Sequence, residues 1–96
     1  MSTATAEMRL VVRGRVQGVG FRWFVRERAR RWGLTGWVRN RPDGTVEWAA
    51  RGDPASLDGL RRDVATGPPN AVVDSVIDLE PDNGSTYDDP FAVRRG

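Results

Sequence analysis

The sequence predicts an α+β domain in which two helices cover one face of a mainly antiparallel sheet. Apolar residues recur with the period of a strand in five short segments and with the period of a helix in two longer ones. Along the chain the order is strand, helix, strand, strand, helix, strand, and a short C-terminal strand completes it. A chain of 96 residues is long enough for one two-layer core but not for two.

The first half of the chain predicts a strand followed by a helix. Residues 8–16 form the strand because Met8, Leu10 and Val12 share one face of an alternating pattern. Residues 21–32 form the helix, and Gly33 ends it at the position where helices favour glycine. Its apolar stripe consists of Phe21, Phe24, Val25, Ala29 and Trp32. The arginines at 26, 28, 30 and 31 form its solvated face.

The second half predicts a hairpin, a helix and two further strands. Residues 35–41 and 45–51 are strands joined by the turn at 42–44, Pro-Asp-Gly. Asp53 caps the second helix and Pro54 takes its first position, and the Gly-Pro-Pro-Asn run at 67–70 ends it. The buried stripe of this helix is Leu57, Leu60 and Val64. Residues 72–79 form the fourth strand, 81–89 a polar loop and 91–94 the last strand.

This order is the split βαβ, or ferredoxin-like, layout. Right-handed crossovers place the 45–51 strand between the 8–16 and 35–41 strands, which run parallel to each other. The ends of those two strands then lie at the same edge of the sheet, about 10 Å apart. Residues at these two ends are therefore candidates for a single site.

Composition indicates a folded chain, with 39% hydrophobic residues and four tryptophans. No stretch approaches the roughly 20 apolar residues of a membrane span, and the N-terminus lacks a signal pattern. We expect a cytoplasmic monomer that does not associate with membranes. We also expect a flexible tail over residues 1–7 and a single domain over residues 8–96.

Missing residue types exclude much catalytic chemistry. The chain has no cysteine and no histidine, and all fifteen basic residues are arginine. Thiolate metal sites, cysteine nucleophiles, Ser-His-Asp triads and lysine Schiff bases are therefore excluded. Arginine, backbone amides, side-chain amides, carboxylates or a bound metal remain. The acids Asp82, Asp88 and Asp89 fit no Mg²⁺ or Ca²⁺ loop, so we expect no metal and no cofactor.

The charge is distributed unevenly. The net charge is +2, but residues 1–51 carry eleven arginines against four acids (+7) and residues 52–96 carry four against nine (−5). A basic half attracts anions. The near-neutral total is modest for a nucleic-acid binder, and we do not expect nucleic acid as a partner.

The loop that joins the first strand to the first helix contains glycines at 14, 18 and 20. Such a loop collects unpaired amides that point one way, and the helix dipole adds partial positive charge. Together with the guanidinium of Arg22, these amides predict a phosphate cradle. The amides belong to Val16, Gln17, Gly18, Val19 and Gly20. The spacing matches neither a P-loop nor a dinucleotide fingerprint, so a glycine-rich turn without a ligand is the alternative.

Asn40 lies near the end of the 35–41 strand. It has the same parity as Val38, so its side chain should point to the helix side, toward the mouth of the loop. A phosphate in the loop with a water above it would fill the gap between them. The alternative is that Asn40 hydrogen-bonds the turn at 42–44, where asparagine is common.

Two motifs resemble those of the acylphosphatase family. The first is Val12-x-Gly14-x-Val16-Gln17-Gly18-Val19-x-Phe21-Arg22, and the second is Gly36-Trp37-Val38-Arg39-Asn40-x-x-x-Gly44-x-Val46 with Gly52. Gly67-Pro68 and Phe91-x-Val93-Arg94 also resemble family positions, so the resemblance covers residues 8–95.

The resemblance implies a small ferredoxin-like enzyme that hydrolyses the carboxyl-phosphate bond of acyl phosphates without a metal or a covalent intermediate. It implies that Arg22 binds the phosphoryl group with the loop amides and that Asn40 orients the attacking water. Inorganic phosphate or sulfate is then the expected competing anion. The chemistry agrees, because a carboxylate leaving group, with a conjugate-acid pKa of about 4, departs without a general acid.

Two other interpretations stay open. A non-catalytic anion- or RNA-binding module has the same layout and would stack bases on sheet aromatics such as Trp37, although paired aromatic RNA-binding motifs are missing. A regulatory domain of the kind fused to larger carbamoyl-transfer proteins is the other, but with both key residues present we expect a free-standing enzyme. Trp32, Trp37 and Trp48 are expected in the core or on a sheet face. Trp23, off the helix stripe, is a candidate for contacting the acyl group.

Overall fold

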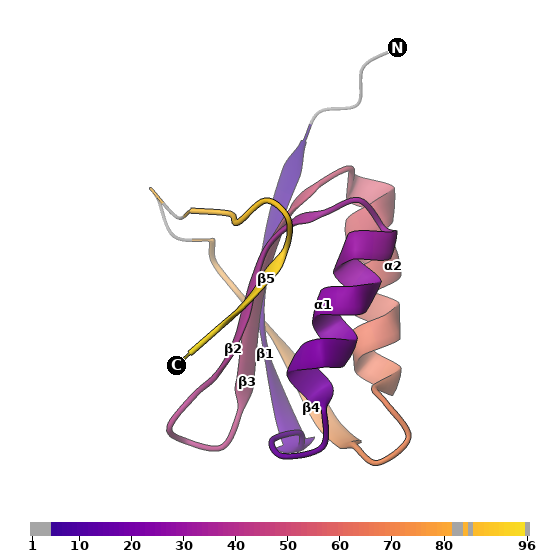
Figure 1. Cartoon of the computed structure of the whole chain (residues 1–96), viewed down its shortest axis with the longest axis vertical. Coiled ribbons are helices and arrows are strands. Elements are labelled where there is room, and N and C mark those ends of the chain that lie inside the picture. The colour runs from indigo at the N-terminus through magenta and orange to yellow at the C-terminus, as the bar shows by residue number, and fades with distance from the viewer. Residues whose placement is uncertain (1–4, 82–83, 85, 96) are drawn as a thin grey trace.

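The computed structural model describes residues 5–81, 84 and 86–95. Its elements are β1 (Ala6–Arg15), α1 (Phe21–Arg31), β2 (Thr35–Asn40), β3 (Val46–Gly52), α2 (Pro54–Thr66), β4 (Val72–Leu79) and β5 (Ala92–Arg94). The five strands form one sheet in the order β4-β1-β3-β2-β5, and both helices cover the same face of it (Figure 1). The predicted ferredoxin-like α+β fold is confirmed. Neither helix in this part of the chain is long and apolar enough to cross a membrane.

Strand β3 separates β1 from β2, as predicted, and pairs antiparallel with both. The ladder between β1 and β3 ends at Val12, opposite Val46. Beyond that point β1 continues along β4 only, through an irregularity at Arg13/Gly14. Gly14 has φ +133°, and a Cβ atom there would collide with the backbone oxygen of Val72. The last residues of β1 are therefore paired with β4 alone before the loop to α1 begins.

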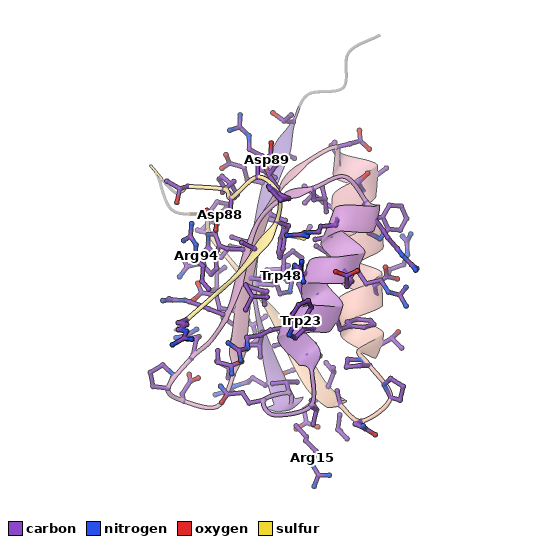
Figure 2. The ribbon with its side chains drawn as sticks, viewed as in Figure 1. Arg15, Trp23, Trp48, Asp88, Asp89 and Arg94 are labelled. Carbon is purple, nitrogen blue, oxygen red and sulfur yellow. The ribbon has the colours of Figure 1, made fainter. Side chains whose placement is uncertain are left out.

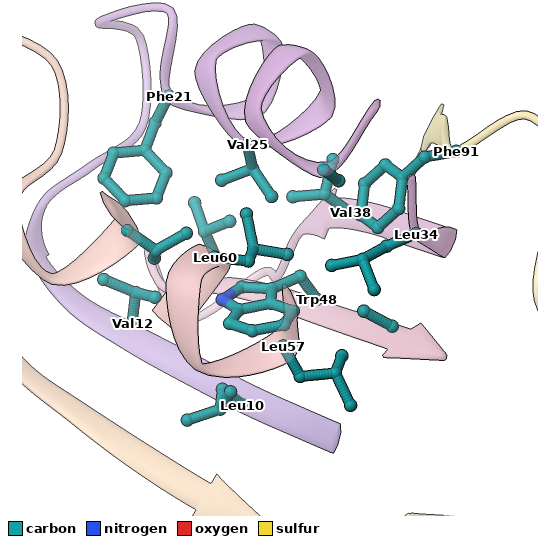
Figure 3. Close-up of a cluster of buried hydrophobic side chains, with 14 of the residues drawn as sticks. Leu10, Val12, Phe21, Val25, Leu34, Val38, Trp48, Leu57, Leu60 and Phe91 are labelled. Atoms are coloured by element: carbon teal, nitrogen blue, oxygen red, sulfur yellow. The ribbon is translucent and has the colours of Figure 1, made fainter. Parts of the chain in front are cut away.

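The core lies between the helices and the sheet, and Trp48 of β3 is at its centre (Figure 3). Its indole ring is fully buried. Around it are the apolar faces of both helices and the inward positions of β1, β2 and β3, with Phe91 closing one end. The predicted stripe of α2, which comprises Leu57, Leu60 and Val64, is buried as expected.

Several element ends are set by local contacts. Asp53 caps α2 by accepting a hydrogen bond from the Ser56 amide at 3.4 Å, as predicted. Strand β1 begins at Ala6, two residues earlier than expected, so Ala6 and Glu7 are not part of a tail. They pair with Gly52 and Arg51 of β3, because the edge of β3 offers hydrogen-bonding partners there.

The expectation that Trp32 lies in the core or on a sheet face is wrong. Trp32 follows α1 and is 39% exposed, and its Nε1 donates to Asp63 Oδ2 of α2 at 2.9 Å. Its ring lies so close to Gly59 that a Cβ atom there would clash with the indole. A glycine inside α2, which weakens a helix on its own, is thus what allows the two helices to approach.

The outer face of the sheet carries a buried ion network. Glu47 of β3 is 1% exposed and accepts hydrogen bonds from Arg9 Nε at 2.6 Å and from Arg39 Nε and Nη2 at 2.9 and 2.7 Å. Burial by itself raises the pKa of Glu47, but the hydrogen bonds from Arg9 and Arg39 outweigh it and lower the pKa below its usual value. Two guanidinium groups, of Arg39 and Arg94, lie over the ring of Trp37.

Replacing Glu47 by Gln should lower the free energy of unfolding by about 2 kcal/mol at neutral pH, because it removes the charge that holds two guanidinium groups. The pKa of Glu47 is lower in the folded chain, so its contribution is complete above the unfolded-state pKa of about 4.3 and is lost as the pH falls through the folded value. Urea unfolding of both proteins, from neutral pH to below about pH 4, should therefore show the difference shrinking.

The matched control is Glu27→Gln on the exposed face of α1, which should change stability by less than about 0.5 kcal/mol. If the difference in free energy of unfolding between Glu47→Gln and the wild type stays constant across the pH range, the lowered pKa of Glu47 in the folded chain is contradicted.

Candidate active site

The loop between β1 and α1 and the turn between β2 and β3 lie at the same end of the sheet, at the bottom of Figure 1. Gly18 and Gly20 in the loop have φ values of +74° and +77°, which favour glycine. Gly20 is the N-cap of α1, and no side chain caps this helix. The predicted loop is therefore an open helix N-terminus rather than a capped one.

The amides of this loop lack protein acceptors. The first backbone hydrogen bond of α1 runs from Phe24 N to Gly20 O at 3.1 Å. Within the described residues, no hydrogen bond is found from the amides between Gln17 and Trp23. The first turn of α1 contains no acidic residue, so nothing neutralises the positive end of its dipole. Such a terminus binds anions.

Arg22 and Asn40 face the same space. A pocket of about 230 Å³ lies over the loop and is lined by Val16, Gly18, Gly20, Phe21, Arg22, Trp23 and Asn40. It is smaller than the roughly 300–1,000 Å³ typical of pockets for drug-sized ligands, which suits a small anion. A second, more open pocket of about 510 Å³ adjoins it and is lined by Arg22, Asn40, Arg41, Pro42 and Arg95.

Asn40 does not bond to the neighbouring turn. It is the last residue of β2, opposite Val46 of β3, and its Oδ1 is buried without a hydrogen-bond partner. The turn is closed instead by its own backbone and by the carboxylate of Asp43, which accepts from Thr45. A buried polar atom without a partner costs about 1–3 kcal/mol. The Asn40 oxygen is thus an acceptor available to a water or a ligand in the pocket.

Arg22 is half-buried in the first turn of α1 and makes no hydrogen bond or ion pair with the described residues. Other arginines are engaged: Arg39 binds Glu47, and Arg94 binds Asp88 through two hydrogen bonds of 2.9 Å. Arg22 therefore keeps its guanidinium donors for a ligand beside the loop amides.

The remaining predicted residues are distributed around this pocket. Gln17 and Val19 do not line it: Val19 packs against the core, and the side chain of Gln17 reaches the β2–β3 turn. Trp23 is 62% exposed, lines the small pocket and has the Arg26 guanidinium 4.3 Å from its ring centroid. Figure 2 shows it beside α1, near the start of the helix.

Sequence reasoning missed two charged lining residues, Arg41 and Arg95, and one side-chain role, that of Gln17. Arg41 follows Asn40 directly, so its position was available from the hairpin pattern. Arg95 lines the open pocket only because β5 pairs in parallel with β2, with Arg94 opposite Arg39. The hydrogen bonds of the Gln17 side chain depend on the register of the hairpin and leave no local signal.

The RNA-binding alternative loses its main support. Trp37, the sheet aromatic that favoured it, is only 8% exposed and lies beneath Arg39 and Arg94.

The acidic residues of the C-terminal loop were also considered as metal ligands. Asp88 binds Arg94, whose hydrogen bonds lower the pKa of that carboxyl, and Asp82 lies outside the described residues. No group of three or more potential metal-binding side chains occurs within residues 5–81, 84 and 86–95.

Comparison with known proteins agrees with the motifs. The family model for acylphosphatase matches residues 8–93. An acylphosphatase of Rubrobacter xylanophilus is 49% identical over 81 residues, which cover 83% of this chain and 74% of the relative. An acylphosphatase of Salinibacter ruber is 46% identical over 97 aligned residues, which cover 99% of this chain and 100% of the relative. The crystal structure of acylphosphatase from Bacillus subtilis superimposes with a TM-score of 0.78 at 38% identity, covering 95% of this chain and 99% of that one.

Proposed function

The chain belongs to the acylphosphatase family, and we propose that the pocket between Arg22 and Asn40 is its active site. Membership makes the protein a hydrolase whose substrates are acyl phosphates. The proposal concerns how this chain performs that reaction and which of its residues do so. Its main support is that Arg22 and Asn40 line the same pocket over a loop whose amides have no protein acceptor.

The phosphoryl group is held by the loop amides and by Arg22. The amides of Val16, Gln17, Gly18, Val19 and Gly20 surround the non-bridging oxygens, and the guanidinium adds a fork of donors. Phosphoryl transfer requires mainly positioning and stabilisation of charge on these oxygens. An amide cradle with one arginine supplies both without a titrating group, and inorganic phosphate or sulfate competes for the same donors.

Asn40 orients the nucleophile. Its buried Oδ1 accepts a hydrogen bond from a water, which then attacks the phosphorus atom. The bond between phosphorus and the acyl oxygen breaks, and its electron pair leaves on the carboxylate. The proton of the water passes to the phosphate product or to solvent. A carboxylate with a conjugate-acid pKa of about 4 needs no general acid, so a chain without histidine, cysteine or lysine is sufficient.

Alanine variants separate these two roles. Arg22→Ala should lower kcat/KM for benzoyl phosphate by about 10²–10³ (about 3–4 kcal/mol) and weaken inhibition by inorganic phosphate, because it removes a donor to the charged oxygens. Asn40→Ala should lower kcat by a similar factor and leave the phosphate inhibition constant nearly unchanged. Steady-state kinetics with phosphate as competitor measure both.

Arg62→Ala, an exposed arginine on α2, is the matched control and should behave like the wild type. Near wild-type turnover of benzoyl phosphate by Arg22→Ala would show that the role is wrongly assigned.

The leaving group should decide which phosphates are hydrolysed. We expect turnover of benzoyl phosphate and no detectable turnover of an alkyl phosphate monoester, whose alkoxide needs protonation that this site does not provide. Added chelator should change neither rate, because amides and arginine hold the phosphoryl group. A chelator-sensitive rate, or equal hydrolysis of the monoester, would contradict this mechanism.

We also propose a cytoplasmic monomer in which residues 8–96, together with Ala6 and Glu7 of β1, form one catalytic domain. The exposed Val72 and Ile77 lie five positions apart on β4, with the exposed polar residues Asp74 and Ser75 between them, so they do not build one contiguous apolar patch. Sedimentation should give a single species of 10.7 kDa, and cell fractionation should recover the activity outside the membrane fraction. A stable dimer would contradict the monomeric state, and activity in the membrane fraction would contradict the cytoplasmic location.

A further inference from the structure

The side chain of Gln17 joins the phosphate loop to the β2–β3 turn. Its Nε2 donates to the carbonyl oxygens of Arg41 at 2.8 Å and Thr45 at 2.9 Å, across sequence separations of 24 and 28 residues. The side chain is half-buried. The residue that follows the buried Val16 therefore reaches out of the loop and across to the turn.

The chemistry of this contact is specific to glutamine. A carboxamide nitrogen carries two hydrogens, and each of them meets one carbonyl oxygen. Both oxygens already close the turn: Arg41 O accepts from Gly44 N at 3.1 Å, and Thr45 O accepts from Arg41 N at 2.8 Å. Glutamate has no hydrogen to donate when ionised, and asparagine is one methylene shorter.

The sheet itself does not hold these two parts together at this end. The β1–β3 ladder stops at Val12 and Val46, and β3 stands between β1 and β2. The loop therefore starts beyond the last ladder pair, while Asn40 is the last residue of β2. Gln17 binds the carbonyl of Arg41, the residue next to Asn40, and so connects the amide cradle to the strand end that carries the carboxamide.

We infer that Gln17 is a positioning residue that sets the spacing between the phosphate cradle and Asn40. The inference rests on the proposed function of these two parts. The attacking water must lie in line with the leaving oxygen, and a displacement of about 1 Å can lower the rate about 100-fold. Loss of the Gln17 side chain leaves the amides and Arg22 in place, so kcat falls while binding of inorganic phosphate is retained.

A double-mutant cycle tests this inference. Gln17→Ala should lower kcat for benzoyl phosphate by about 10-fold or more in the wild-type background, with the phosphate inhibition constant changed less than about twofold. In the Asn40→Ala background the same substitution should lower kcat by less than about twofold, because there is no longer a carboxamide to position. Equal losses in both backgrounds, or no loss in the wild type, would overturn the inference.

The matched control is Arg30→Ala. Arg30 Nε donates to the carbonyl of Phe91 at 3.0 Å, which is also a bond from a side chain to a distant carbonyl, but at the opposite end of α1. It should leave kcat unchanged. If the Arg22 and Asn40 variants lose activity as proposed while Gln17→Ala does not, only the role of Gln17 is wrong. If the Arg22 and Asn40 variants keep their activity, the proposed function itself fails.

Gln17→Glu provides a second test that does not depend on the alanine variant folding. The ionised carboxylate would face two carbonyl oxygens, whereas the protonated acid donates one hydrogen and restores one of the two bonds. Repulsion by the carbonyls raises the pKa of such an acid. The ratio of variant to wild-type kcat should therefore rise as the pH falls from about 7 to about 5. A ratio that stays flat or falls would overturn the inference.

Discussion

The amides at the start of α1 need an acceptor that the protein does not supply, and the site is arranged around this requirement. The two helices differ in a revealing way: Asp53 caps α2, whereas Gly20 begins α1 with no side-chain cap. A capping side chain typically stabilises a helix by about 1 kcal/mol. Arg22 adds a cation at the positive end of the helix dipole, where it is unfavourable. An anion bound in the proposed cradle would relieve both costs and so compensate for the locally unfavourable sequence.

The fold places Asn40 at the same end of the sheet as the loop between β1 and α1. Because β3 lies between β1 and β2, the loop and Asn40 approach from strands that do not pair with each other. Both helices pack on the inner face around Trp48, and the outer face is closed by Glu47 with Arg9 and Arg39. The loop amides, Arg22 and Asn40 thus lie together at one end of the two-layer sandwich. Donors held in place in this way are the most effective at stabilising developing charge.

Much of this arrangement was predictable from the sequence. The element order, the Asp53 cap and the inward direction of Asn40 follow from short-range periodicity and turn chemistry, which are local properties. Three features were not predictable from local sequence. The position of Trp32 depends on the spacing of the two helices, and the burial of Glu47 depends on which charges face it across strands. The position of Arg95 depends on the parallel pairing of β5 with β2. Gln17 was identified only through its backbone, since its side-chain partners lie 24 and 28 residues away.

The central claim is that one anion binds between the loop amides of residues 16–20, Arg22 and Asn40. Titration of the isotopically labelled protein with inorganic phosphate, followed by amide and side-chain NMR shifts, tests this most directly. The largest changes should fall on the loop amides from Val16 to Gly20, on the Arg22 Nε and on the Asn40 carboxamide. Changes centred on the outer sheet face around Trp37 and Arg94, with the loop amides unmoved, would contradict it.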